Sequence, residues 1–185
     1  MCSSDLLIRR GRDPLVGITA HEATITLRIT ARAADVAACE ALIAPTEAVI
    51  RQSLGELVYG VEDDEVEDAV IRLLHDRGLS LATCEIGTTG RVAELLADAQ
   101  SRHRAGRPAG QPPHGFRGGL VVGMPPAETS AADLAARARD QFGAAIGLGI
   151  SAARPGEQGR MVIDLAAVSD AGTDLVQHVC GGGAA

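Results

Sequence analysis

The fold of this chain is decided by residues 55–90, GELVYGVEDDEVEDAVIRLLHDRGLSLATCEIGTTG. Helical spacing predicts a helix carried by a stripe of apolar residues: Val66, Ala69, Val70, Leu73 and Leu74. Gly78 is predicted to end it, a strand follows over residues 79–85, and a turn rich in Gly and Thr leads into a helix that reaches about Gln100. In α/β proteins such a turn binds anions, because the first N–H groups of the helix lack internal partners.

This turn carries the candidate binding residues. Gly87 and Gly90 permit close approach of the backbone to a ligand, and Thr88 or Thr89 can cap the helix. Glu85 ends a buried strand, where a charge needs a partner or a function. The pattern therefore predicts a phosphate or carboxylate pocket. The alternative is an ordinary strand-to-helix connection with a threonine cap.

The chain offers no obvious nucleophile at this turn. Cys84 is predicted inside the strand, where a buried thiol behaves as a small, inert hydrophobe. Thr88 and Thr89 carry hydroxyl groups but need a base to activate them. No metal site is expected, because the histidines lack ligand spacing: His21, His75, His103, His114 and His178.

The residues before this stretch predict a small β-β-α unit. Two strands are expected within residues 15–32, since apolar and polar side chains alternate there, and a helix is expected over residues 34–54. Pro45 is predicted to kink this helix or divide it in two, and Gly55 to end it.

The residues after the turn predict more short strands and a helix. Residues 101–117, rich in Arg, Gly and Pro, are expected to form a surface loop that contains solvated His103 and His114. Strands are predicted at 118–124, 144–151 and 160–168, and a helix at 131–142. Together they predict an α/β sheet covered on both faces. The expected organisation is a first domain at 5–60, a second at 61–170 and a disordered tail at 171–185.

Composition excludes several classes of protein. The net charge is −7 and the aromatic residues are Tyr59, Phe116 and Phe142, so nucleic-acid binding is not expected. No run of about 18 apolar residues and no signal peptide is visible, so we expect no contact with a membrane. The four cysteines are far apart in the sequence, which suits a reducing compartment, and we therefore expect a cytoplasmic protein.

The chain contains no lysine, because all 17 of its basic residues are arginine. This excludes a Walker A lysine, a Schiff-base lysine and a Ser–Lys dyad.

Residues 54–96 resemble the CinA family of bacterial competence- and damage-inducible proteins, through the VYG-EDD motif and the strand–turn–helix. Residues 5–33 are similar to the KH-like middle domain of that family. GFRGGLVVG (115–123), FGAAIGLGISA (142–152) and GRMVIDLAAV (159–168) are similar to later strands of its C-terminal domain.

The resemblance implies a three-layer α/β/α deamidase-like domain preceded by a KH-like β-β-α unit. It implies hydrolysis of the amide of nicotinamide mononucleotide, a reaction of NAD salvage, without a cofactor. The ligand-binding residues expected from the turn and the resemblance together are Glu85, Gly87, Thr88, Thr89, Gly90, Gly118 and Gly119.

The chain departs from the family where the chemistry takes place. Ile86 stands at the position of the family's serine nucleophile, and the family's lysine has no counterpart. Our hypothesis is a CinA-like protein that binds a nicotinamide nucleotide but hydrolyses it poorly. The alternatives are an active deamidase that uses Thr88 or Thr89 with Glu85, and a structural or homo-oligomerisation module. The chain is expected to be either a natural short form or a fragment of a longer protein.

Overall fold

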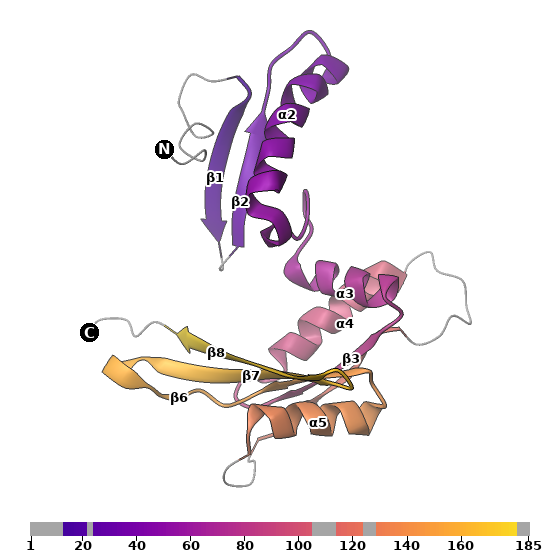
Figure 1. Cartoon of the computed structure of the whole chain (residues 1–185), viewed down its shortest axis with the longest axis vertical. Coiled ribbons are helices and arrows are strands. Elements are labelled where there is room, and N and C mark those ends of the chain that lie inside the picture. The colour runs from indigo at the N-terminus through magenta and orange to yellow at the C-terminus, as the bar shows by residue number, and fades with distance from the viewer. Residues whose placement is uncertain (1–12, 22–23, 105–113, 124–128, 181–185) are drawn as a thin grey trace. The chain divides into compact units, whose positions relative to one another are not determined.

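A computed structural model describes residues 13–21, 24–104, 114–123 and 129–180 (Figure 1). The chain divides into two units, Met1–Tyr59 and Gly60–Ala185, and the division lies next to the predicted boundary at residue 60.

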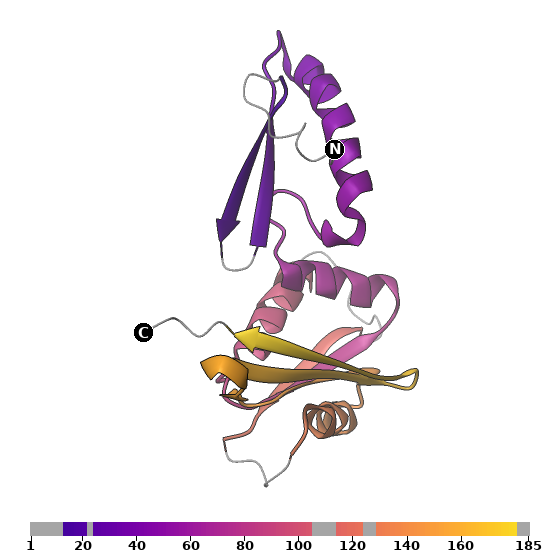
Figure 2. The ribbon, with the colours of Figure 1, turned by 60° about the vertical axis from the view of Figure 1, so that its left-hand side comes forward.

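The first unit is a two-stranded antiparallel sheet with one long helix (Figure 2). Its pairing places Val16 opposite Ile29, with side chains of alternate residues on the same face. Tyr59 returns to the hairpin and donates a hydrogen bond from its hydroxyl to Thr24 Oγ1 over 3.2 Å. Its elements are β1 (Leu15–His21), β2 (Thr24–Thr30), α2 (Val36–Leu54) and the 3-10 helix η1 (Gly55–Leu57).

The helix of this unit excludes one of the two effects predicted for Pro45, a division of the helix. Pro45 does not divide it, because α2 continues through the proline as one element of 19 residues. The apolar side chains of α2 are only partly buried: Ile50 is 7% exposed, whereas Val36 is 74% exposed. Two short strands offer little surface for a helix of this length to cover. Gly55 ends the helix as predicted, with a positive φ of 53°.

The second unit contains a mixed sheet with the strand order β4-β3-β5-β7 and β8 on the outer side of β7. Strand β3 pairs in parallel with β4 and β5, whereas β7 pairs antiparallel with β5 and β8. The elements in chain order are α3 (Val66–Asp76), β3 (Ser80–Glu85), α4 (Arg91–Arg104), β4 (Gly115–Val121), α5 (Ala131–Phe142), β5 (Ile146–Ile150), β6 (Arg154–Pro155), η2 (Glu157–Gly159), β7 (Met161–Ser169) and β8 (Gly172–Cys180).

Helices cover both faces of this sheet, which confirms the predicted three-layer α/β/α class (Figures 1 and 2). On one face Leu81 packs with Ile71 of α3 and Leu96 of α4. On the other face Cys84 packs with Leu134 of α5. Strand β3 is buried along its whole length and lies between β4 and β5 in the sheet.

The predicted disordered tail at 171–185 is wrong for residues 172–180. These residues form β8, which pairs with β7 from Ser169↔Gly172 to Met161↔Cys180. A two-residue loop, Asp170–Ala171, joins the strands. The hairpin forms because β7 has an open edge for β8 to join, which the local composition of the tail does not reveal. Residues 181–185 lie outside the described residues.

The predicted loop at 101–117 is also shorter at both ends. Helix α4 continues to Arg104, and β4 begins at Gly115. The loop's residues 105–113 lie outside the described residues. Within the described parts of the chain, no helix is long and apolar enough to cross a bilayer.

Candidate functional site

Strand β3 sends alternate side chains to the two layers of helices. Leu81 lies in the cluster beneath α3 and α4, and Thr83 and Glu85 share its face because side chains alternate along a strand. Cys84 and Ile86 pack against α5 on the opposite face. The strand therefore delivers the predicted acid and the residue at the nucleophile position to opposite sides of the sheet.

Glu85 is completely buried, and its carboxylate lies at the N-terminus of α4. Oε1 accepts a hydrogen bond of 2.7 Å from the backbone N–H of Ala93, and Oε2 accepts one of 3.1 Å from that of Val92. The hydroxyl of Thr88 donates to Oε2 over 2.5 Å, and that of Thr83 donates to Oε1 over 3.5 Å. The charge thus has its partners inside the protein.

These contacts give Glu85 a structural role that the sequence pattern did not distinguish from a catalytic one. Its carboxylate satisfies the otherwise unpaired first N–H groups of α4 and lies at the positive end of the helix dipole. An anion that entered from solvent would have to compete with it. The first N–H groups of α4 are therefore already occupied by the protein's own anion.

Ile86 and Cys84 belong to the core rather than to a reactive site. Ile86 is 6% exposed and its N–H donates to Ile150 O over 3.0 Å. Burial raises the pKa of the Cys84 thiol; Arg137 opposes this and Glu85 adds to it. The prediction of an inert Cys84 agrees with this position.

The turn between β3 and α4 has unused hydrogen-bond donors. Positive φ values occur at Gly87 (79°), Thr89 (55°) and Gly90 (85°). Among the described residues, no backbone N–H from Gly87 to Gly90 has an acceptor, and Gly87 and Thr89 are exposed. Successive N–H groups in a turn of this kind form a concavity suited to an anion.

The paired glycines of β4 serve packing. A Cβ on Gly119 would lie 2.5 Å from that of Ala93, and one on Gly118 would lie 2.5 Å from Phe142 Cε1. Both glycines let helices approach the strand closely. Their role as ligand-binding residues stays a prediction.

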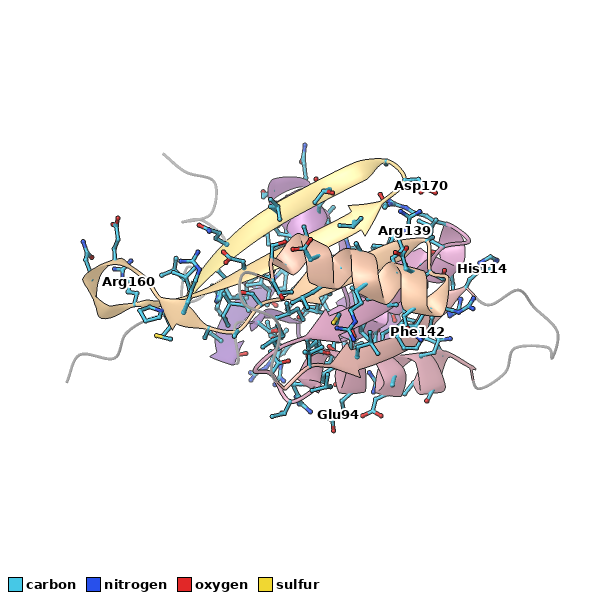
Figure 3. The ribbon with its side chains drawn as sticks, turned by 90° about the horizontal axis from the view of Figure 1, so that it is seen from below. Glu94, His114, Arg139, Phe142, Arg160 and Asp170 are labelled. Carbon is cyan, nitrogen blue, oxygen red and sulfur yellow. The ribbon has the colours of Figure 1, made fainter. Side chains whose placement is uncertain are left out.

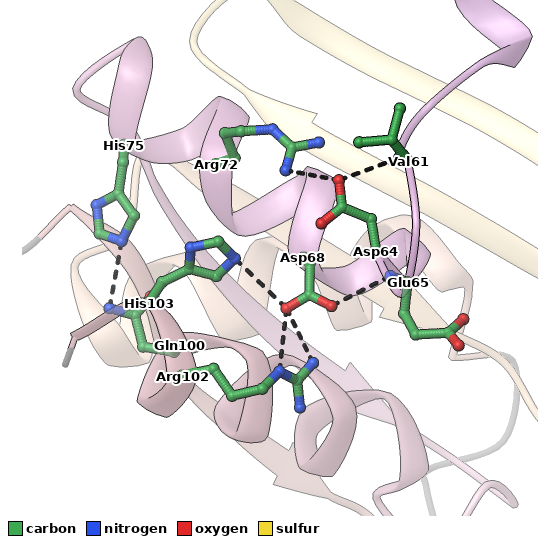
Figure 4. Close-up of polar contacts among 9 residues, drawn as sticks. All are labelled: Val61, Asp64, Glu65, Asp68, Arg72, His75, Gln100, Arg102 and His103. Carbon is green, nitrogen blue, oxygen red and sulfur yellow. Dashed lines mark hydrogen bonds and ion pairs between the residues drawn. The ribbon is translucent and has the colours of Figure 1, made fainter. Parts of the chain in front are cut away.

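A polar cluster that the sequence did not predict joins α3 and α4 (Figure 4). Asp68 Oδ1 accepts hydrogen bonds from Arg102 Nε at 3.1 Å and from Arg102 Nη2 at 2.9 Å. His103 Nε2 lies 3.4 Å from the same oxygen, and Gln100 Nε2 donates to His75 Nε2 over 3.5 Å. His103 is therefore paired on a helix, which corrects its predicted place in a solvated loop.

Burial acts on the Asp68 carboxyl to raise its pKa. The hydrogen bonds from the Glu65 N–H and Arg102, with the charges of Arg102 and His103, outweigh this effect and leave the pKa below its usual 3.8. The cluster thus holds a mostly buried negative charge between two helices. Within the described residues, no three His, Cys, Asp or Glu side chains gather where they could hold a metal.

A shallow cavity of about 470 Å³ lies away from the turn, at the hairpin end of β6 and β7. Figure 3 places Arg160 at this end, far from Glu94 on α4 and from Phe142 on α5. Arg154 on its wall is held by Asp164, at 3.1 Å from Nε to Oδ2. No residue predicted for the site lines this cavity.

Comparison with known proteins identifies the first unit. Residues 5–60 match the family described as the damage-inducible protein CinA KH domain. This range includes β1, β2 and α2, so the observed β-β-α arrangement agrees with the match.

Longer relatives extend the similarity into the second unit. A CinA-like protein of Frankia casuarinae is 35% identical over 175 residues, which cover 83% of this chain and 38% of the relative. CinA-like proteins of Kosmotoga olearia (39% over 92 residues) and Gloeobacter violaceus (45% over 87 residues) match about half of the chain. The chain spans only 20% to 38% of the length of these relatives.

Proposed function

Because this chain belongs to the CinA family, we propose that its second unit is a deamidase-like domain that binds a nicotinamide nucleotide and hydrolyses it poorly, if at all. Binding is assigned to residues 83–90, where β3 turns into α4. The amide hydrolysis is proposed from the resemblance to the family alone, since the chain covers only 38% of the length of its Frankia relative.

The unused N–H groups of the turn support the binding part of this proposal. Four successive residues, Gly87 to Gly90, have backbone donors without acceptors among the described residues, and the turn is partly open to solvent. A phosphate group offers several acceptor oxygens to such donors. Glu85 fixes the start of α4 beneath them and so keeps the turn in one shape.

The surroundings of Ile86 carry the proposal of impaired hydrolysis. A nucleophile needs an attacking atom that is accessible and a base beside it. Ile86 has no such atom, packs in the core and lies on the face opposite Glu85. The chain also has no lysine, so the family's lysine has no counterpart at the turn. Loss of such groups reduces turnover by orders of magnitude.

Two measurements on one sample test the proposed binding and the proposed impairment. Nicotinamide mononucleotide is titrated into the protein by calorimetry, and the sample is then assayed for ammonia. We expect heat of binding with saturation and no ammonia above the protein-free rate. Absence of binding would overturn the ligand assignment, and ammonia release would overturn the proposed impairment.

Two variants at one exposed position locate the binding site. Gly87→Asp places a negative charge beside the free N–H groups, whereas Gly87→Asn has nearly the same shape without the charge; both residue types tolerate a positive φ. Gly87→Asp should weaken the affinity for nicotinamide mononucleotide at least about tenfold, which corresponds to ~1.4 kcal/mol. Gly87→Asn should weaken it far less. Equal effects of the two would place the phosphate elsewhere.

One contact favours a second candidate function, a deamidase that uses Thr88. Its hydroxyl lies 2.5 Å from Glu85 Oε2, within reach for proton transfer to a base. If ammonia is released, Thr88→Val should abolish the release. Thr89→Val serves as the control, because the Thr89 hydroxyl bonds only to the backbone oxygen of Thr88.

A further inference from the structure

Strand β8 is an open edge of the sheet. Among the described residues it pairs only with β7, and residues 172–179 are exposed. Figure 3 shows it as the outermost strand of its side. Leu175 (68% exposed), Val176 (59%) and Val179 (47%) lie on a strand of nine residues whose outer N–H and C=O groups have no partner strand.

This edge has few of the features that keep edge strands apart, since Asp174 is its one acidic side chain. Charged side chains, proline, bulges and short length normally prevent pairing. β8, GTDLVQHVC, has no Pro, Arg or Lys and pairs with β7 without a register shift. The other edge, β4, has such protection, since its register shifts opposite Leu81 and Ala82.

We propose that β8 is a docking surface for β8 of a second copy of this chain, in an antiparallel pair centred on Val176. A two-fold axis through Val176 uses the whole strand, with Gly172 opposite Cys180 of the second copy. It joins the two sheets into one continuous sheet and places Val176 of one copy against Val176 of the other.

The hydrogen-bonding groups fit this register. The two-residue loop makes Ser169 and Gly172 a hydrogen-bonded pair, so even-numbered β8 residues bond to β7 and odd-numbered ones direct their N–H and C=O groups outward. The axis then pairs Leu175 with Gln177 and Thr173 with Val179. These pairs supply about eight new backbone hydrogen bonds.

The side chains are complementary in the same register. Asp174 of each copy lies opposite His178 of the other, and the two Val176 side chains meet between these pairs. An N–H of the His178 imidazole can donate a hydrogen bond to the facing carboxylate, and polar pairs at facing positions stabilise antiparallel strands. A shift of the axis to residue 175 or 177 places Asp174 opposite Val176 or Cys180 and loses the match.

The oligomeric state of the full chain is the first test. Light scattering coupled to size-exclusion chromatography should give twice the 19.0 kDa of one chain. Val176→Lys places two cations together at the axis and should give the mass of one chain, whereas Val176→Thr, a strand-compatible control, should stay dimeric. Circular dichroism checks that both variants fold, which their exposed position favours.

Charge exchange tests the register. Asp174→Arg removes the carboxylate that faces His178 and should lower the dimer fraction. The double variant Asp174→Arg with His178→Asp places opposite charges at the facing positions and should recover the dimer.

Cross-linking tests the centre of the pair in a chain with Cys2, Cys39 and Cys180 replaced by serine. Facing Cα atoms lie about 4.5–5.5 Å apart, within the range of a disulfide, so Val176→Cys should form a covalent dimer with oxidised glutathione. Leu175→Cys should not, because diagonal positions lie about 7–8 Å apart. A monomeric wild-type protein would overturn the proposal. A dimer that persists in both Val176→Lys and Asp174→Arg would also overturn it, because the copies would then pair through another surface.

Discussion

At the scale of single residues, Glu85 shows how a buried charge can serve the fold. The carboxylate comes from β3 but completes the hydrogen bonding of α4, because it accepts from Val92 and Ala93. It therefore ties a strand to a helix across the turn. The residue that a functional interpretation would select first is also a structural cap.

Glu85→Gln should destabilise the protein by about 2–3 kcal/mol, because an amide replaces a charged acceptor and its NH₂ group meets the N–H donors of α4. Thr88→Val removes a single hydroxyl and should cost about 1 kcal/mol. Urea unfolding of both variants measures the difference. Equal stabilities of Glu85→Gln and the wild type would contradict the structural role.

Asp68 should make stability depend on acid pH. Its pKa is lower in the folded protein than its usual 3.8, so its stabilising contribution is complete above pH 3.8 and is lost as the pH falls through the folded-state value. Asp68→Asn should remove about 1 kcal/mol at pH 7, since Arg102 is 53% exposed and solvent screens its charge.

Unfolding by urea at a series of pH values from 7 to 3 isolates this effect. The difference in stability between wild type and Asp68→Asn should narrow toward pH 3. Asp63→Asn, an exposed change in the segment before α3, is the matched control and should follow the wild type. A constant difference across the series would exclude Asp68 as the source.

At the scale of elements, α5 rests directly on the backbone of β5. A Cβ on Gly149 would lie 1.9 Å from Ala131 O, and one on Gly147 would lie 1.9 Å from Ala135 O. Alanines on α5 and glycines on β5 thus set the distance between helix and sheet. That distance in turn determines how tightly Ile86 is enclosed by α5.

Gly149→Ala should therefore destabilise the second unit by about 3 kcal/mol or more, because neither backbone can give way without moving the helix. Gly123→Ala is the control, since a Cβ there meets nothing within 4 Å. Thermal unfolding followed by circular dichroism compares the two. A loss below about 1 kcal/mol would show that α5 is less closely packed than described.

At the scale of the whole molecule, the absence of lysine limits the chemistry of every surface. No segment that folds next to the turn can bring a lysine to it, because the chain has none. The proposed impairment of hydrolysis thus depends on the complete sequence as well as on Ile86.

Ile86→Ser should not produce ammonia from nicotinamide mononucleotide, although it restores a hydroxyl at the matched position. It should also cost about 3 kcal/mol, because it leaves a cavity and buries a hydroxyl in an apolar cluster. Ile86→Val, with a cost of about 1 kcal/mol, is the control for the cavity. Turnover by Ile86→Ser would mean that an arginine or the backbone replaces the lysine.

The sequence by itself determined the class of the fold and most of its elements. Alternation in β2, helical spacing in α3 and the glycines at 55 and 78 act through neighbours in the chain, so local patterns reveal them. It also determined the absence of lysine and the isoleucine at residue 86.

Only the tertiary structure decided which apolar residues are buried and what the charged ones do. Ile71 is fully buried while Leu73 of the predicted stripe is 50% exposed, because the position of α4 selects the face of α3. β8 needed the open edge of β7, and Asp68 needed Arg102 from another helix. Glu85 became a cap because the fold brings Ala93 within 2.7 Å of it. Each depends on contacts between segments that local sequence patterns do not encode.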